Sequence, residues 1–326
     1  MKSLTTKTQN PVVIAGIAIL SFMLISGCTE KSQEVTAEAL EQSLESVAVD
    51  IKEMEERIGE KAGEIKEAAT SSEKEIPQTA HVIGAAKLIV DNLAETQKFY
   101  ESMFGMKEVR RYDYDLDTFE ETIMGFDGGG ATLALFAPND KVEMPLKKPA
   151  APLVLIYTPE FKAITKRIEN AGYPVSIFMT KETGPFNVAI ARDPSGNAVE
   201  IFGRDSAEYE VGGSKLMVDD RVAAEEFYKE ILDATPRDYY KTSTYDEVIV
   251  SYGDGPFHAL YQPLNEDPLP KSIFPQTAIY TTDFDGVLAK IEKRGLGYRE
   301  VKTQIEDLRI IIAKDTAGNA IEIISR

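Results

Sequence analysis

The sequence predicts an α+β protein in which a strand–helix–strands unit occurs twice in each half of the folded part, behind a signal peptide and a long helix. Residues 86–106 (AKLIVDNLAETQKFYESMFGM) match residues 214–234 (SKLMVDDRVAAEEFYKEILDA). In each half a second strand and helix follow, and Gly-Tyr follows each of these helices. Each half then ends with a similar segment, DPSGNAVEIF (193–202) in the first and DTAGNAIEII (315–324) in the second.

The N-terminal 27 residues have the character of a signal peptide. Lys2 and Lys7 supply a positive start, and residues 11–26 form an apolar run that is short for a membrane span. Residues 24–28 (LISGC) resemble the bacterial lipobox, which implies that Cys28 becomes the lipidated (palmitate-bearing) N-terminus of a lipoprotein. The alternative is an exported protein whose one cysteine has no such role.

The lipobox resemblance also implies a location. A residue other than Asp after the cysteine, here Thr29, favours the outer membrane. The predicted location is therefore the bacterial cell envelope, with the lipid in the outer membrane and the protein facing the periplasm. The membrane is then the first predicted partner, since several buried acyl chains anchor a protein firmly.

Residues 28–80 are predicted to form a helical stalk and linker. Between residues 36 and 70 apolar side chains recur in steps of four and three, over about three heptads, as in a short coiled coil. The stalk would let the protein self-associate through residues 36–70. The alternative is an amphipathic helix that lies on the protein's own domains.

Each repeat begins with an apolar strand, followed by an Asn or Asp that suits a helix N-cap and by an amphipathic helix that carries Phe-Tyr. Strand-like runs follow at 121–138 and 247–263. The second strand and helix of each half fall within 151–173 and 275–298. A glycine after each of these helices suits a helix C-terminus.

This order of elements and these repeated sequence segments resemble the vicinal oxygen chelate superfamily, the fold of glyoxalase and bleomycin-resistance proteins. The resemblance implies two tandem domains, at 81–205 and 209–326, each made of paired βαβββ modules. The superfamily contains lyases, dioxygenases, epimerases and binding proteins, so the fold alone does not fix an activity.

The resemblance also implies where a metal would be held. In metal-using relatives each module supplies a His or Gln from its first strand and a Glu from its last strand. By counting from the Phe-Tyr tyrosines, the positions are Ala85, Ala134, Pro152 and Glu200 in the first domain, and Gly213, Ala259, Gln276 and Glu322 in the second. The prediction is therefore no cofactor, with a divalent metal on Gln276 and Glu322 as the alternative. His258 is one residue from a ligand position, and strand alternation turns it to the other face.

Two lysines predict a different use of the acidic positions. Lys87 and Lys215 lie two residues after the first ligand position, so they face the same cavities. A buried carboxylate is costly unless it is paired. The hypothesis is that Lys87 pairs with Glu200 and Lys215 pairs with Glu322 in place of a metal. The alternative leaves both lysines free for an anionic ligand.

The same alternation predicts two apolar pockets that include Val154, Ile156, Tyr261 and Tyr280. Such pockets suit a small apolar or aromatic ligand fixed by a few polar groups. The alternative is that these side chains fill the core. Lys87, Glu200 and Lys215 complete the predicted ligand pockets.

Composition narrows the function further. The chain has 326 residues and a formal charge of −18, which disfavours binding to nucleic acid. One cysteine excludes an intramolecular disulfide, and two histidines exclude a His-rich metal site.

These features together favour a lipid-anchored periplasmic protein that binds a small molecule without a metal over an enzyme, but they leave a catalytic role open. The first alternative is a metal-dependent lyase or dioxygenase that acts from the second domain, through Gln276 and Glu322. The second alternative is a structural envelope protein that assembles through its stalk.

Overall fold

The computed structural model describes residues 79–113, 119–138, 151–183, 186–265, 274–303 and 305–326, which belong to one compact unit. The predicted signal peptide, Cys28 and the predicted helix at 36–70 lie outside the described residues. In the described part, every helix is too short or too polar to cross a membrane.

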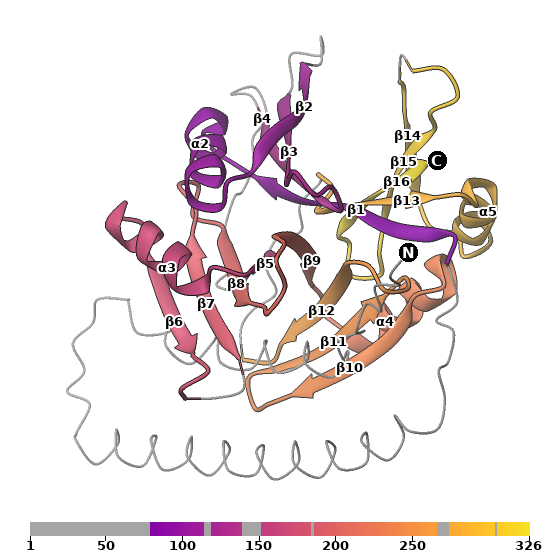
Figure 1. The fold of residues 1–326 in the computed structure, drawn as a ribbon. Coiled ribbons are helices and arrows are strands. Elements are labelled where there is room, and N and C mark those ends of the chain that lie inside the picture. Colours follow the sequence, from indigo (N-terminus) through magenta and orange to yellow (C-terminus); the bar gives the residue numbers. More distant parts are fainter. Residues whose placement is uncertain (1–78, 114–118, 139–150, 184–185, 266–273, 304) are drawn as a thin grey trace, which may run out of the picture. The chain divides into compact units, whose positions relative to one another are not determined.

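Each half of the described chain contains two modules of one strand, one helix and further strands, as Figure 1 shows. The first module comprises β1 (His81–Ile89), α2 (Leu93–Phe104), β2 (Lys107–Asp113), β3 (Phe119–Gly125) and β4 (Thr132–Pro138). The second module comprises β5 (Val154–Thr158), α3 (Phe161–Asn170), β6 (Val175–Met179), β7 (Asn187–Arg192) and β8 (Ala198–Gly203).

The second half repeats this order. The third module comprises β9 (Glu210–Met217), α4 (Arg221–Leu232), β10 (Thr235–Lys241), β11 (Tyr245–Ser251) and β12 (Phe257–Pro263). The fourth module comprises β13 (Thr277–Thr281), α5 (Phe284–Lys293), β14 (Tyr298–Val301), β15 (Ile310–Lys314) and β16 (Ala320–Ser325). The predicted α+β class and the paired βαβββ modules are thus confirmed.

Local signals explain where the helices begin. The side chain of Asn92 accepts a hydrogen bond from the Glu95 amide, at 3.1 Å, and so caps α2. Asp220 caps α4 in the same way through the Ala223 amide, at 3.0 Å. The predicted N-caps are therefore confirmed. Gly105, with φ of 72°, ends α2 in the left-handed conformation that glycine tolerates.

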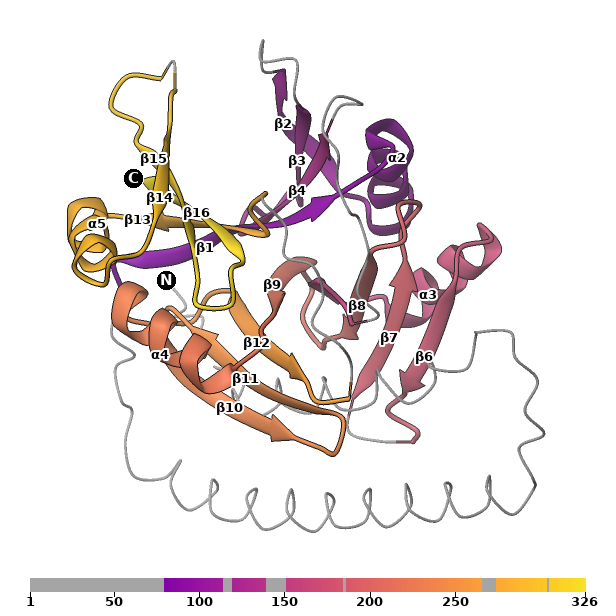
Figure 2. The same ribbon diagram turned by 180° about the vertical axis from the view of Figure 1, so that it is seen from behind.

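The sheets join modules that are far apart in the sequence. One eight-stranded sheet has the order β14-β15-β16-β13-β1-β4-β3-β2, and the other has the order β10-β11-β12-β9-β5-β8-β7-β6. The first and fourth modules therefore share a sheet through the antiparallel pair β1 and β13. The second and third modules share the other sheet through β5 and β9. Figure 2 shows the junction of β1 and β13 from behind.

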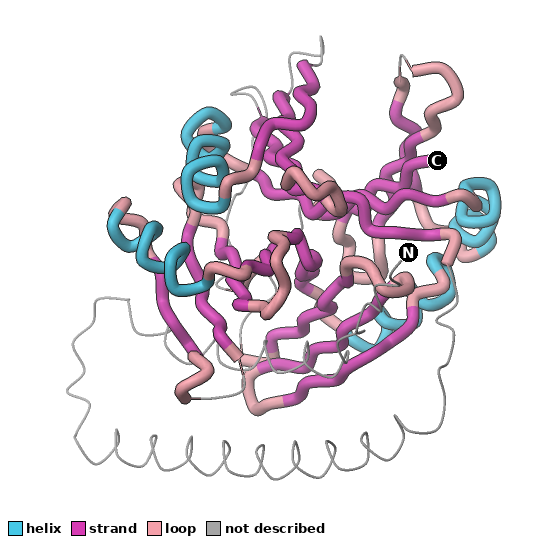
Figure 3. The backbone as a smooth tube through the Cα atoms, viewed as in Figure 1, coloured by secondary structure: helices cyan, strands magenta, loops and turns pink. Residues whose placement is uncertain are grey.

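This topology corrects one expectation. The sequence order suggested that the two modules of each half enclose a common cavity. The structure instead builds each helix-free sheet face from one module of each half. The helices lie on the opposite faces, where α2 contacts β3 and β4, and α4 contacts β11 and β12. Figure 3 shows each helix against the strands of its own module.

The hydrophobic cores, unlike the sheets, follow the sequence halves. One core cluster contains Leu88, Phe99 and Phe104 of the first module together with Ile164 and Ile201 of the second. The other cluster joins residues of the third and fourth modules and also contains Ile83 of the first module. Each half is thus held together by its helix-side core, while each sheet joins one half to the other.

The repeated segments before β8 and β16, at residues 193–197 and 315–319, also hold each half together. Asp193 accepts hydrogen bonds from the backbone and side-chain nitrogens of Asn197, and the Asn197 side chain donates to the Ile89 carbonyl in the first module, at 3.1 Å. The hydroxyl of Tyr100, from the predicted Phe-Tyr pair, donates to Asp193 at 3.3 Å.

The second half repeats these contacts. Asn319 donates to Asp315 and to the Met217 carbonyl, and the Tyr228 hydroxyl donates to Asp315. The recurrence of Asp, Gly-Asn and Phe-Tyr in the sequence is therefore explained by module packing.

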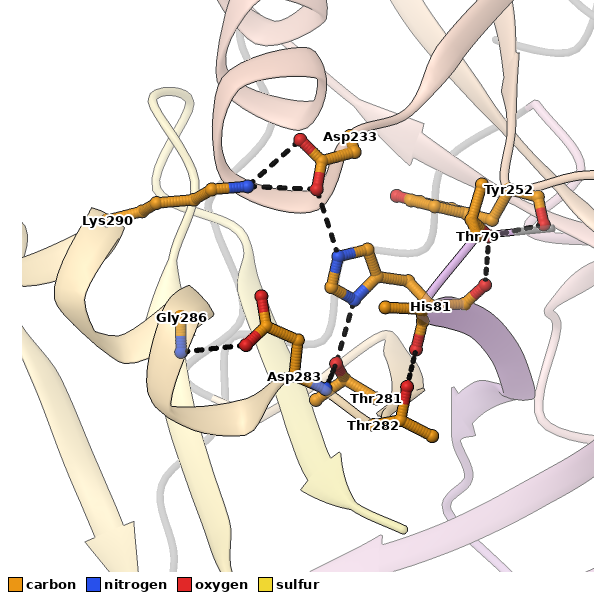
Figure 4. A network of polar contacts seen from close by, with 10 residues as sticks. Thr79, His81, Asp233, Tyr252, Thr281, Thr282, Asp283, Gly286 and Lys290 are labelled. Carbon is orange, nitrogen blue, oxygen red and sulfur yellow. Dashed lines mark hydrogen bonds and ion pairs between the residues drawn. The ribbon is translucent and has the colours of Figure 1, made fainter. Parts of the chain in front are cut away.

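His81 connects three modules. Its Nδ1 lies 2.9 Å from the Thr281 hydroxyl, and its Nε2 lies 3.4 Å from Asp233, which Lys290 also binds (Figure 4). Burial lowers the pKa of His81, against the opposing effect of Asp233. His81 is at a strand end, but it is buried.

Candidate functional site

A buried lysine lies between two carboxylates on the helix-free face of the first sheet. The Lys87 Nζ is 2.7 Å from Glu121 Oε1 and 2.8 Å from Glu322 Oε2. The three side chains are 6%, 5% and 15% exposed, respectively. They come from β1, β3 and β16, so this arrangement, the Lys87 site, needs the first and the fourth modules.

The second sheet carries an equivalent arrangement, the Lys215 site. Lys215 on β9 donates to Glu247 on β11, with 2.7 Å between Nζ and Oε2. Glu200 on β8 is close enough for both of these groups to act on its pKa. All three residues are buried, and they come from the second and third modules.

Strand register confirms that the two sites are equivalent. Lys87 lies beside Ala134 across the β1–β4 pair, and Lys215 lies beside Ala259 across the β9–β12 pair. In the neighbouring pairs, Glu121 lies opposite Phe136, and Glu247 lies opposite Tyr261.

The predicted ion pairs were right in kind and wrong in their partners. The structure pairs Lys87 with Glu322 and Lys215 with Glu247, not Lys87 with Glu200 and Lys215 with Glu322. The reason is that each site joins modules from different halves of the chain. Both ammonium groups are engaged by carboxylates, so neither lysine is left free for an anionic ligand.

Glu121 and Glu247 were missed by the sequence reasoning. A signal for them exists, because β3 and β11 contain the aligned runs ETIMG (121–125) and EVIVS (247–251). Each run places a carboxylate on an otherwise apolar strand, as Glu200 and Glu322 do on theirs.

The carboxylates and lysines change one another's titration. Burial by itself would lower the pKa of Lys87, but Glu322 and Glu121 together raise it well above its ordinary value. Burial raises the pKa of Glu121 against the effect of Lys87. In the other site, burial raises the pKa of Glu200 to about 8, opposed by Lys215 and reinforced by Glu247. Burial likewise raises the pKa of Glu247, with Lys215 opposing the rise.

The Lys87 site has a small-residue and apolar lining. Ala85, Ala134, Ala278 and Ile324 form a cluster there, with half-buried Tyr280 against it. Beside this cluster, Phe136 lies between Phe119 and Phe274, at ring-centroid distances of 4.4 and 4.5 Å. Tyr280, which the sequence placed in one pocket with Tyr261, therefore lies in the lining of the Lys87 site instead.

The Lys215 site is more aromatic and more enclosed. Tyr261 stacks on Tyr245 at 5.0 Å, and the Lys215 Nζ is 5.0 Å from the centre of the Tyr261 ring. Tyr261 is thus brought to Lys215, as predicted. Tyr157 and Tyr261 are each only 2% exposed.

The prediction for β5 was wrong by one residue. Leu155 and Tyr157 cluster with Phe202 on the helix-free side. Val154 and Ile156 belong instead to the helix-side core. A register irregularity between Leu155 and Ile156 in the β5–β9 pair accompanies this difference.

The residues of the Lys87 site do not fit a divalent metal ion. Two of the four family ligand positions in this sheet are Ala85 and Ala134, whose side chains cannot coordinate. Glu322 is paired with Lys87, whose ammonium group already supplies the positive charge between two carboxylates. Divalent metal sites draw on several protein ligands. In the Lys215 site, the Lys215 ammonium group likewise supplies the positive charge beside the carboxylates.

Within the described residues, no cluster of three or more His, Cys, Asp or Glu side chains is suited to a metal. His258 lies on the helix side, as strand alternation predicted, between the Tyr252 hydroxyl at 3.2 Å and the Thr277 hydroxyl at 3.0 Å. Burial lowers the pKa of His258 to about 3.

Solved structures share this fold at low sequence identity. A point mutant of glyoxalase I from Zea mays superimposes with a TM-score of 0.61 and 19% identity, covering 75% of this chain and 92% of that one. A putative dioxygenase from Bacillus subtilis superimposes with a TM-score of 0.59 and 16% identity, covering 76% and 86%. At these identities the likeness concerns the fold alone. No curated protein matches the chain.

The sequence itself matches a family at two places. The family model described as the Glyoxalase/Bleomycin resistance protein/Dioxygenase superfamily matches residues 78–201 and 211–323. Those two matches cover most of the chain, and the four modules observed in the structure fall almost entirely within them. The chain therefore belongs to the Glyoxalase/Bleomycin resistance protein/Dioxygenase superfamily.

Proposed function

We propose that this protein is a metal-independent small-molecule-binding member of its superfamily and that the Lys87 site is its ligand site. The observation that supports this most is the position of the Lys87 ammonium group, within 2.8 Å of carboxylate oxygens from Glu121 and Glu322. The Lys87 ammonium group supplies the positive charge that a bound metal ion would supply in metal-using relatives.

The lining favours a ligand with an apolar or aromatic body and at least one hydrogen-bond donor. The alanines and Ile324 form an apolar lining, and the half-buried Tyr280 packs against it. The buried Oε1 of Gln276 has no hydrogen-bond partner among the described residues, so it suits a donor on the ligand.

We also propose that the protein works in the bacterial envelope, held by lipid on Cys28. The support is the lipobox-like run at residues 24–28. Expression in a bacterium with radiolabelled palmitate tests this, because wild type should incorporate label and Cys28→Ala should not. Label on the alanine variant, or none on wild type, would contradict the anchor.

Metal independence is tested on the full chain, purified without chelator and without a metal-binding tag. We expect no stoichiometric metal, and no shift in the melting temperature on addition of Mn²⁺, Ni²⁺ or Zn²⁺. Near-stoichiometric metal that is lost in Glu322→Ala would instead support the enzyme alternative.

Ligand binding is tested with the neutral fluorescent probe N-phenyl-1-naphthylamine. We expect saturable binding to wild type and binding at least about tenfold weaker in Tyr280→Ala, which removes an aromatic wall of the Lys87 site. Tyr239→Ala is the matched control, because Tyr239 is 56% exposed on β10. Equal loss in both variants, or no saturable binding, would count against the proposal.

A further inference from the structure

The Lys215 site contains more buried polar atoms than its own residues satisfy. Several oxygens on or beside its lining have no hydrogen-bond partner among the described residues: Glu200 Oε1, Glu247 Oε1 and the hydroxyls of Tyr157, Tyr240 and Tyr245. Buried polar groups without partners are costly and few in native proteins. Two of these atoms are carboxyl oxygens, which can accept hydrogen bonds from donors on a bound molecule.

The walls around these oxygens are aromatic. Tyr245 and Tyr261 stack with an interplanar angle of 22°, and the Tyr157 ring meets Phe202 edge-on at 5.6 Å. Aromatic faces together with carboxylates attract cations. Lys215 already illustrates this, because its ammonium group lies near the Tyr261 ring and on Glu247. Glu200 Oε1, in contrast, has no hydrogen-bond partner among the described residues.

We propose that the Lys215 site binds one small primary alkylammonium cation, which donates hydrogen bonds to Glu200 Oε1 and to the neighbouring tyrosine hydroxyls. A primary ammonium group has three donors, which matches a carboxyl oxygen flanked by hydroxyl groups. This site is separate from the ligand site proposed on the other sheet. The inference therefore does not depend on that function.

Charge balance links this binding to a proton. With Glu200 protonated, Lys215 and Glu247 leave the site neutral, so a cation enters at no net cost only when Glu200 gives up its proton to the solvent. Burial holds the pKa of Glu200 at about 8. The other charged groups that act on the tyrosines of this site are Arg204, Glu210, Arg237 and Asp238. Affinity should therefore rise on the order of fiftyfold from about pH 6 to about pH 8, and then level off.

The experiment is isothermal titration of the full chain with methylammonium chloride near neutral pH. Titrations in two buffers of different ionisation enthalpy count the protons released, and sodium chloride at equal ionic strength is the reference. We expect saturable binding with nearly one proton released for each cation. No heat beyond the sodium chloride reference, or binding without proton release, would overturn the proposal.

Two variants locate the binding. Glu200→Gln keeps the shape of the protonated acid, so it should fold, lose the proton release and bind at least about tenfold more weakly. Glu322→Gln changes the equivalent residue of the Lys87 site and should bind methylammonium like wild type. Tyr245→Phe removes one unpartnered hydroxyl and should weaken binding severalfold. Equal affinity in wild type and Glu200→Gln would refute the site.

Discussion

Lys87 and Glu322 are separated by 235 positions in the chain, yet the Lys87 Nζ lies 2.8 Å from Glu322 Oε2. The pair joins the first strand of the folded part to its last, inside one sheet. Neither half of the sequence can therefore complete the Lys87 site alone. The same holds for the Lys215 site, where Glu200 belongs to the first half and Lys215 and Glu247 to the second.

Removal of the Lys87 ammonium group should be strongly destabilising. Lys87→Met leaves Glu121 and Glu322 buried without a cation, and breaking a buried pair in this way costs about 3 to 5 kcal/mol. Denaturant unfolding of the full chain measures this loss. In the triple variant Lys87→Met, Glu121→Gln, Glu322→Gln, most of the stability should return because no charge is left buried.

The matched control for that loss is an exposed ion pair. Lys162 and Glu182 are 2.8 Å apart, with side chains 76% and 63% exposed. Lys162→Met should change the free energy of unfolding by less than about 1 kcal/mol. Similar losses in Lys87→Met and Lys162→Met would show that Lys87 is not compensating buried carboxylates.

The exchanged pairing of modules should be visible as an energetic coupling. A double-mutant cycle on Lys87→Met and Glu322→Gln should give an interaction energy of about 1 to 3 kcal/mol, because the two groups touch. The cycle on Lys87→Met and Glu200→Gln should give a value near zero, since Glu200 belongs to the other sheet. A large coupling with Glu200 and none with Glu322 would support the order of pairing that the sequence suggested.

The sequence was sufficient to predict the four modules, but it was not sufficient to predict which modules share a sheet. Asn92, Asp220 and the periodic apolar residues are local signals, and they give helices and strands where they predict them. The choice between β1–β13 and a pairing of β1 with β5 depends on packing between distant segments. Both alternatives join the same kinds of strand, so no local pattern in one sequence distinguishes them.

The candidate site was predictable in part for the same reason. Strand alternation places Lys87, Lys215, Glu200 and Glu322 on the helix-free faces, as the structure does. Alternation does not say which strands become neighbours, so the partners were assigned wrongly. On β5, the inward positions are Leu155 and Tyr157, one residue from the predicted ones, although the β5–β8 pairing is regular.

The raised pKa of Glu200 predicts that the protein loses stability as the pH rises. Its pKa is about 8 in the folded protein and about 4.3 in an unfolded chain, so the folded state binds the proton more tightly. Between these values stability falls with rising pH, by at most about 1.4 kcal/mol per pH unit from this group. Glu200→Gln removes this contribution.

The measurement compares the free energy of unfolding of wild type and Glu200→Gln at several pH values. The free energy of unfolding of the variant, relative to that of wild type, should increase from about pH 5 to about pH 8. Above about pH 8 the difference should stay constant. A difference that does not change with pH would mean that Glu200 titrates like an exposed carboxyl group.

His258 predicts the opposite dependence at lower pH. Burial lowers its pKa to about 3, whereas an unfolded histidine titrates near 6.5. As the pH falls below about 6.5 the unfolded chain takes up a proton that the folded protein excludes, so this histidine reduces stability progressively down to about pH 3. His258→Gln can still bond with Tyr252 and Thr277 but does not titrate. The variant should therefore be less sensitive to acid than wild type, by up to about 1.4 kcal/mol per pH unit. Parallel stability profiles for the two proteins would mean that His258 has the same pKa in the folded and unfolded states. That result would contradict its burial on the helix side of β12.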